Sequence, residues 1–350
     1  MPEIASNPSR RLILALGAAA LVPFRATPGR AEDDRTPAAL QFTLDRPIDA
    51  IAAPFVLAGT RGLYRAENLN VATNVAAGSR ETIARIASGA SDVALADLNA
   101  LIRYRGDEDA APVKAVFILL NTAPYAIVAR KSRGIATPAS LEGRTLGVAD
   151  GDLAIRLWPA LARKIGVKAA AVKIEKISAA VREPMLSAGQ VDAVTGYSYL
   201  SAVNLRNRGV PADDLAVFRF ADYGSAAYGA AVIVNPKTAA ARPDAVKGFV
   251  HAVTAATQLA IKNPTAAVDD ALTQMDNGIR DLELTRLRVA IADNILTDDV
   301  RRDGLGGVDA RRFEASLDEI AEDHTLRKRP ILADIFDDAF LPGTVGRKIN

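Results

Sequence analysis

Short apolar runs alternate with amphipathic stretches along most of the chain. The runs at residues 39–44, 71–75 and 93–97 have the length and composition of buried strands. Helix signals separate them: residues 53–64 are mostly apolar with two turn glycines, and Ser79 is placed to cap a helix that has one apolar face. Repeated strand-helix-strand units predict parallel sheets covered by helices.

Residues 113–120 and 126–129 are expected to form two further strands around a proline turn. A second series of the same kind begins after a short linker near Thr137. The next elements repeat the earlier order, with a strand at 146–148, a helix at 153–164 and a strand at 172–177. Beyond residue 228 the pattern becomes mainly helical. The order of elements therefore indicates two similar α/β lobes and additional helices.

The first thirty residues have the pattern of an export signal. Arg10 and Arg11 precede an uncharged apolar run at 12–22, and small residues lead to Ala31. At ~1.5 Å per residue this run is too short to cross a hydrocarbon core of ~30 Å. Because the string SRRLIL resembles a twin-arginine signal, both the twin-arginine and the general secretory route stay open. We expect residues 1–31 to be a signal peptide, cleavage after Ala31 and a periplasmic mature protein.

The charge of the chain gives no support to a nucleic-acid partner. The formal net charge is +2, but residues 1–31 hold four arginines and one acid. Without them, 39 basic and 40 acidic residues remain, so the body carries a formal charge of −1. A nucleic-acid-binding protein would be expected to show a basic face.

The sequence also contains few signs of catalysis. There is no cysteine, which excludes cysteine nucleophiles and cysteine metal sites, and the two histidines lie far apart. Esterase, zinc-protease, P-loop and dinucleotide-binding signatures are missing. His251 and His324 are expected to be packed or exposed structural residues, because neither has a partner at motif spacing. We therefore expect a binding protein without metal or cofactor rather than an enzyme.

Several segments together resemble a known family, the substrate-binding proteins of ABC importers. The resemblance covers residues 38–264, in the order that the family shows. It rests on TRGLYRAENLNV, AAGSRETIARIASGASDVALAD, PYAIVARKSRGIATPASLEGRTLGV, AGQVDAVTGY and FADYGSAAYGAAVIVNP. The subgroup that these segments resemble includes binders of thiamine pyrimidine precursors, aliphatic sulfonates, taurine and nitrate.

The resemblance implies a fold and a mode of action. The fold is the α/β type II periplasmic-binding-protein fold, in which two lobes with parallel-type sheets are joined by a two-strand hinge. Lobe I would comprise 38–136 and 224–350, and lobe II would comprise 137–223. The lobes would close on a small molecule and then be recognised by the importer's membrane permease, with the protein itself a monomer. Pyrimidine-synthesising enzymes of the same superfamily are the alternative from another class, and the missing cysteines disfavour it.

The ligand is expected at the loops that follow the strands, because open α/β sheets bind small molecules at the carboxyl ends of their strands. Gly78 and Gly151 precede helix starts whose free N–H groups can receive an oxyanion or a carbonyl. The full set of expected binding residues is Asp45, Arg46, Gly78, Ser79, Asp97, Asn121, Tyr125, Asp150, Gly151, Asp152, Arg182, Tyr197, Asp222 and Tyr223.

The residue types in this set bear on the class of ligand. Five aspartates against Arg46 and Arg182, together with several tyrosines, favour a neutral or amine-bearing ring such as a thiamine pyrimidine precursor. Some of the aspartates could instead be helix caps or partners of the arginines. An aliphatic sulfonate, taurine or nitrate would bind at the helix starts near Ser79 and Gly151, so both ligand classes stay open.

Overall fold

The computed structural model describes residues 36–349. The expected signal peptide at residues 1–31 lies outside the described residues. Within residues 36–349, no helix combines the length and apolar character that a membrane crossing requires.

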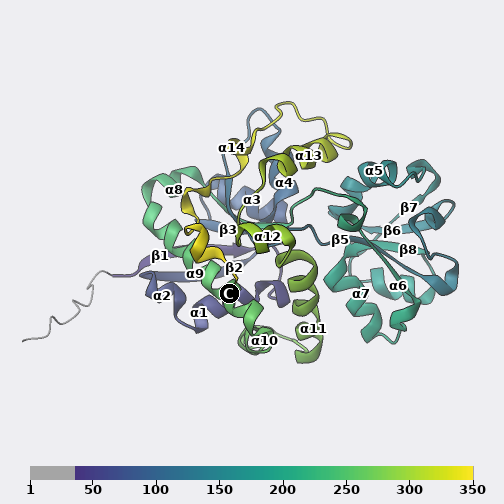
Figure 1. Ribbon diagram of the computed structural model, residues 1–350, viewed down its shortest axis with the longest axis horizontal. Helices are drawn as coiled ribbons and strands as arrows, with labels where there is room; N and C mark the ends of the chain where they lie inside the picture. The colour runs from purple at the N-terminus through teal and green to yellow at the C-terminus, as the bar shows by residue number, and fades with distance from the viewer. Residues whose placement is uncertain (1–35, 350) are drawn as a thin grey trace, which may run out of the picture. The chain divides into compact units, whose positions relative to one another are not determined.

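A five-stranded sheet with the order β2-β1-β3-β10-β4 forms the centre of the first lobe (Figure 1). Strand β1 is parallel to β2 and β3, whereas β10 is antiparallel to β3 and β4. The strands are β1 (Ala38–Leu44), β2 (Leu69–Val75), β3 (Val93–Asp97), β4 (Lys114–Ile118) and β10 (Ala230–Val234).

A second five-stranded sheet, β7-β6-β8-β5-β9, forms the centre of the second lobe. Strand β6 is parallel to β7 and β8, whereas β5 is antiparallel to β8 and β9. The strands are β5 (Tyr125–Arg130), β6 (Thr145–Ala149), β7 (Lys173–Ile177), β8 (Ala193–Tyr197) and β9 (Leu215–Arg219). In both sheets the fourth strand arrives from the other lobe and runs antiparallel, which confirms the expected architecture of two similar α/β lobes.

The chain crosses between the lobes twice, and the two crossing segments are hydrogen-bonded to each other. Ala123 donates its N–H to the carbonyl of Ala227 at 3.0 Å, and Gly229 donates to Leu120 at 2.9 Å. The first crossing lies between β4 and β5, so the expected lobe boundary after residue 136 is too late: β5 already pairs with β8 and β9. The return lies between β9 and β10, an interval that includes the expected boundary after residue 223.

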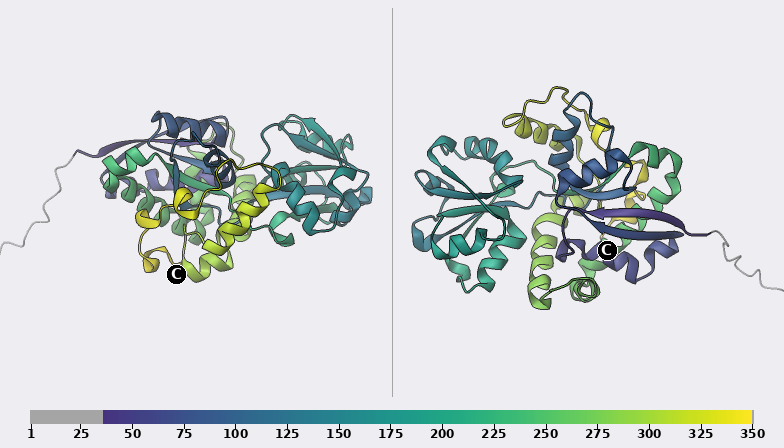
Figure 2. Two further views of the ribbon diagram at one scale, coloured as in Figure 1. Left: turned by 90° about the horizontal axis from the view of Figure 1, so that it is seen from above. Right: turned by 180° about the vertical axis from the view of Figure 1, so that it is seen from behind.

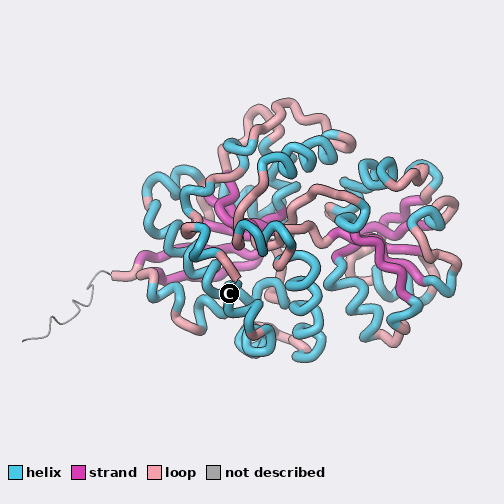
Figure 3. Tube along the Cα trace, viewed as in Figure 1, coloured by secondary structure: helices cyan, strands magenta, loops and turns pink. Residues whose placement is uncertain are grey.

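Helices cover both faces of each sheet (Figure 3). The expected helix at 53–64 is divided by a turn at Gly62, whose φ of 69° is left-handed. The helices are α1 (Ala53–Thr60), α2 (Leu63–Ala66), α3 (Ser79–Ser88), α4 (Leu98–Arg105), α5 (Ala154–Lys164), α6 (Arg182–Ala188), α7 (Ser198–Asn207), α8 (Pro236–Ala241), α9 (Pro243–Lys262), α10 (Pro264–Leu272), α11 (Arg280–Ala290), α12 (Asp298–Asp303), α13 (Ala310–Ala321), α14 (Leu332–Ile335) and α15 (Thr344–Arg347).

Aromatic side chains fill the core between the first sheet and helix α9. Phe249 is fully buried, and its ring centroid lies 5.1 Å from that of Phe42 and 5.3 Å from that of Tyr64. The C-terminal helices, coloured yellow-green to yellow in Figure 2, return to the first lobe. Among them, α13 buries Phe313, Leu317 and Ile320 in a cluster that also contains residues of α4 and of α5 in the second lobe. The region beyond residue 235 therefore completes the first lobe and also packs against the second.

Candidate functional site

A cavity of about 1050 Å³ is lined by residues of both lobes. Its walls come mainly from the loops that follow β1, β2 and β6 and from the end of β8, which are carboxyl ends of parallel strands. This is the edge at which α/β sheets bind small molecules. The expected residues that line it are Asp45, Arg46, Gly78, Ser79, Asp150, Gly151, Asp152 and Tyr197.

On the first lobe, an ion pair and a hydroxyl form one wall of the cavity. Arg46 donates from Nε and Nη2 to the two oxygens of Asp45, both at 2.9 Å. Ser79 donates to Asp45 Oδ2 at 3.0 Å and accepts from the N–H of Asp97 at 3.0 Å. Ser79 is the first residue of α3 and not its cap, because Gly78 occupies the cap position with a φ of 109°. The carboxylate of Asp45 therefore lies at the start of α3.

On the second lobe, Asp152 has the corresponding place at the start of α5. Its Oδ1 accepts from the N–H of Ala154 at 2.8 Å, and its Oδ2 accepts from Thr195 Oγ1 at 2.6 Å. The guanidinium of Arg182 lies 3.7 Å from Asp152 Oδ2, and its side chain is only 11% exposed. Arg182 therefore supports Asp152 from behind and does not line the cavity.

Tyr197, at the end of β8, presents an aromatic surface between the two walls. Its ring centroid lies 5.8 Å from that of Tyr199 and 6.2 Å from that of Tyr125, and the Arg46 guanidinium carbon lies 5.1 Å from it. Burial raises the pKa of Tyr197 to about 12, so the phenol is neutral at physiological pH. The cavity thus combines a flat ring with a guanidinium and neutral hydroxyl groups.

Asp97 and Tyr125 are brought together, but in a buried network that does not line the cavity. Tyr125 donates to Asp97 Oδ2 at 2.6 Å, and the Asn99 backbone and side chain donate to Asp97 Oδ1 at 2.8 and 2.9 Å. Because Asp97 ends β3 and Tyr125 begins β5, the network joins the two sheets. The polar atoms of Asp97 and Tyr125, expected to contact the ligand, instead form hydrogen bonds within the protein.

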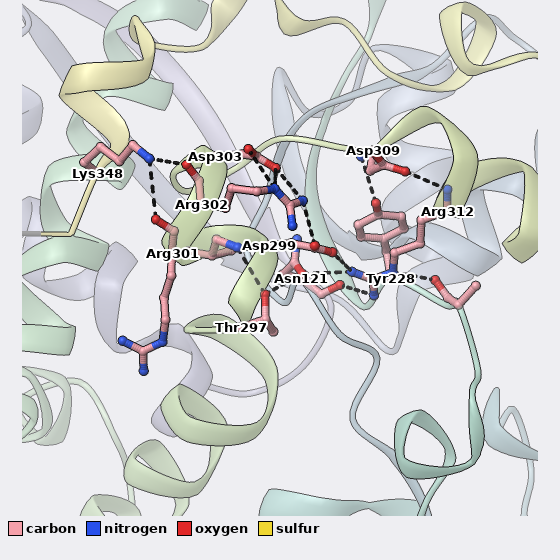
Figure 4. Close-up of polar contacts among 12 residues, drawn as sticks. Asn121, Tyr228, Thr297, Asp299, Arg301, Arg302, Asp303, Asp309, Arg312 and Lys348 are labelled. Carbon is pink, nitrogen blue, oxygen red and sulfur yellow. Dashed lines mark hydrogen bonds and ion pairs between the residues drawn. The ribbon is translucent and has the colours of Figure 1, made fainter.

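Asn121 is held by the C-terminal helices, as Figure 4 shows. Its side-chain oxygen accepts from Thr297 at 2.7 Å and from Arg312 at 2.9 Å, and the Arg312 guanidinium lies 4.0 Å from the centroid of the Tyr228 ring. Asn121 lines a different cavity, of about 530 Å³. Its partners lie 176 and 191 residues further along the chain, so local sequence could not reveal them.

Asp222 and Tyr223 also lie away from the main cavity. Asp222 forms a bidentate ion pair with Arg219, with both hydrogen bonds at 2.8 Å. It lines a third cavity, of about 380 Å³. The ring of Tyr223 meets the edge of Phe218 at 6.5 Å between centroids. Both residues follow β9 and belong to the second lobe.

Another group of cavity residues lies outside the strand-end loops and was not predicted from the sequence. They are Arg103 and Tyr104 of α4, Arg156 of α5, Lys176 of β7, and Asp323 and His324 beyond α13. Asp323 lies 3.1 Å from Arg103 and 3.8 Å from Arg156, so it joins both lobes at the edge of the cavity. His324, expected to be purely structural, also lines the cavity. Within the described range, no cluster of three or more His, Asp or Glu side chains could hold a metal ion.

The buried carboxyl of Asp97 predicts a measurable pH dependence. Burial raises its pKa above the ordinary 3.8, although hydrogen bonds from Tyr125 and Asn99 oppose the rise. The folded protein therefore binds this proton more tightly than the unfolded chain does, and its free energy of unfolding falls as the pH rises through the raised pKa. Asp97→Asn removes this titration. Urea unfolding should show the stability of the variant, relative to wild type, increasing as the pH rises above about 4.

Asp214 provides a control of opposite sign. Hydrogen bonds from the Ser132 backbone and from Arg130 lower its pKa to about 2. The wild type therefore gains stability from this group as the pH rises from about 2 through the ordinary 3.8. Asp214→Asn should lose stability relative to wild type over that interval. A pH-independent difference between wild type and Asp97→Asn would contradict the account of Asp97.

Comparison with known proteins identifies the family. A family model described as "NMT1/THI5 like" matches residues 50–267. The riboflavin-binding protein RibY of Chloroflexus aurantiacus is 28% identical over 293 residues, which cover 79% of this chain and 80% of that protein.

Solved structures share the fold at low sequence identity. The periplasmic aliphatic sulphonate binding protein SsuA from Escherichia coli has a TM-score of 0.70 at 15% identity and covers 88% of this chain and 94% of its own. The desulfurization enzyme DSZB has a TM-score of 0.58 at 14% identity and covers 89% and 99%. The two-lobed architecture is therefore the periplasmic-binding-protein fold. Since the family model matches more than half of the chain, the chain belongs to the NMT1/THI5-like family.

Proposed function

We propose that this protein is the solute-binding component of an ABC importer, and that it captures a planar nitrogen heterocycle in the cavity between its lobes. The observation that carries the proposal is the cavity itself, which lies at the strand ends of both lobes and is walled by Tyr197 and the Asp45–Arg46 pair. Two lobes joined by a two-segment hinge can close on such a solute.

The two helix starts in the cavity are occupied by carboxylates, which supports a neutral ring over an anion. Helix starts attract anions because their N–H groups are free. Here Asp45, through Ser79, stands at the start of α3, and Asp152 accepts the Ala154 N–H at the start of α5. An aliphatic sulfonate, taurine or nitrate would have to approach two carboxylates at the positions where an anion would otherwise bind. Ring N–H and amine groups could instead donate to the same oxygens.

The size of the cavity favours a ligand larger than a single ring. Ligand pockets commonly have volumes of roughly 300–1,000 Å³, and this cavity has about 1050 Å³. A flavin fits that range better than a lone pyrimidine does, and the relative RibY is named a riboflavin-binding protein. Riboflavin is therefore the favoured ligand, and a thiamine pyrimidine precursor is the smaller heterocycle of the same class.

We also propose that the protein does not convert its ligand. The desulfurization enzyme DSZB shares the fold, so the fold alone is compatible with catalysis. This chain, however, has no cysteine and none of the catalytic signatures sought in its sequence. The role in import further supposes export to the periplasm through a signal peptide cleaved after Ala31, a monomeric mature protein and a membrane permease as partner.

A thermal-shift panel on the mature protein tests the proposal. A ligand at 100 times its dissociation constant adds about 2.7 kcal/mol to stability. We expect the largest shift with riboflavin, a smaller one with an aminopyrimidine, and none with an alkanesulfonate, taurine or nitrate. Mass spectrometry of the released ligand should show it unchanged. A shift with the sulfonate alone would reverse the ligand class, and steady product formation would establish an enzyme.

A further inference from the structure

Glu319, in the last turn of α13, is a buried carboxylate whose two oxygens both have partners. Its side chain is 5% exposed. Oε1 accepts from Lys164 Nζ at 2.5 Å and from the N–H of Ala226 at 2.8 Å, and Oε2 accepts from Ser225 Oγ at 2.8 Å. Lys164 Nζ also donates to the carbonyl of Gly224 at 2.6 Å. This group of contacts lies outside the ligand cavity described above.

These contacts join three separate parts of the fold. Glu319 lies on α13, which packs against α4 and α14 of the first lobe and also against α5 of the second. Lys164 ends α5 in the second lobe, and residues 224–226 lie in the crossing that returns the chain to the first lobe. A single carboxylate therefore holds both lobes and one of the two crossing segments.

Two more ion pairs continue the contact along the same edges of α5 and α13. Arg163 pairs with Glu322, and Arg156 lies 3.8 Å from Asp323 at the wall of the ligand cavity. Exposed ion pairs contribute little on their own. A buried carboxylate is different, because removing its partner leaves a charge without compensation. Glu319 and Lys164 are therefore the pair in this contact with the largest expected effect.

We propose that Glu319 and Lys164 form a positioning pair that sets the arrangement of the lobes and thereby the affinity of the cavity. Breaking the pair removes the buried polar link between α5, α13 and the returning crossing and leaves only their apolar packing and exposed ion pairs, so a larger share of molecules has separated lobes. Apparent affinity falls in proportion to the share of molecules that are competent to bind. The affinity part of this inference rests on the proposed function, whereas the effect on lobe separation does not.

Lobe separation can be measured without any ligand. Because the chain has no cysteine, spin labels can be placed on two introduced cysteines, at Arg65 of α2 and Lys173 of β7, which are exposed in different lobes. Pulsed electron resonance then gives the distribution of distances. Glu319→Gln keeps the size of the side chain and one acceptor oxygen but removes the charge, and Lys164→Met removes the partner. Each should shift the distribution to longer and broader distances than in the wild type.

Asp318→Asn is the matched control on the same helix. Asp318 is 72% exposed and pairs with Arg329 inside the first lobe, so the variant should retain the wild-type distribution. The double variant of Glu319 and Lys164 should show no larger shift than either single variant, since both remove one interaction. Distributions that match the wild type in both single variants would overturn the proposal.

The effect of the Glu319–Lys164 pair on the affinity of the cavity is tested with riboflavin as the probe. Glu319→Gln and Lys164→Met should each weaken binding about fivefold or more, mainly through faster dissociation, while Asp318→Asn binds like the wild type. Unchanged affinity despite shifted distances would refute the link between the pair and the cavity. If no protein, the wild type included, binds riboflavin while the distances still shift, the proposed ligand is wrong and the role of the pair in lobe separation stands.

Discussion

Replacing Tyr197 with alanine is expected to weaken riboflavin binding by about 1–3 kcal/mol, which corresponds to roughly 5- to 150-fold. The reason is the loss of the flat ring at the end of β8, against which the heterocycle would stack beside Arg46. Quenching of flavin fluorescence in an equilibrium titration measures the change.

Tyr197→Phe is the matched control for this prediction. It keeps the ring and removes only the hydroxyl, so its affinity should stay close to that of the wild type. Far-ultraviolet circular dichroism should show that both variants are folded. Wild-type affinity in a folded Tyr197→Ala protein would place the ligand away from the end of β8.

Replacing Phe249 with alanine is expected to lower the free energy of unfolding by about 3–5 kcal/mol. Phe249 is fully buried in the middle of α9, and its ring packs against Phe42, Phe55 and Tyr64. Truncation leaves a cavity that the surrounding strand and helices can fill only in part. Urea unfolding followed by circular dichroism measures the loss across both lobes.

Leu259→Ala on the same helix provides the comparison. Leu259 is 44% exposed, and surface substitutions usually change stability by about 0.5 kcal/mol or less. Fluorescence of Trp158, the single tryptophan, reports separately on the second lobe, where it is 3% exposed. Equal losses in the Phe249 and Leu259 variants would show that the aromatic cluster is not the core of the first lobe.

The strands could be predicted from the sequence because period and length are local properties. The apolar runs at 39–44 and 93–97 correspond to β1 and β3 almost residue for residue. The lobe boundary could not be located in the same way. Strand β5 follows β4 after a short turn, yet its partners β8 and β9 lie some 60 to 90 residues further along the chain. Pairing over such distances leaves no local pattern.

The strand-end loops of the candidate site were predictable for a similar reason. Asp45 and Asp152 follow parallel strands, and the carboxyl ends of such strands meet at one edge. The partners of these residues were not predictable: Ser79 and Thr195 come from other elements. Counting aspartates therefore overstated the negative charge offered to a ligand. His324 was expected to have only a structural role, yet it lines the cavity. The position of its loop, beyond α13, depends on packing against elements that are far away in the sequence, so the residues around His324 did not reveal it.

The most direct measurement of the central claim is a crystal structure of the mature wild-type protein with riboflavin. We expect the flavin ring to lie in the cavity of about 1050 Å³, against Tyr197 and Arg46, with ring N–H groups directed to Asp45 or Asp152. A flavin bound outside this cavity, or an empty cavity at saturating riboflavin, would contradict the central claim.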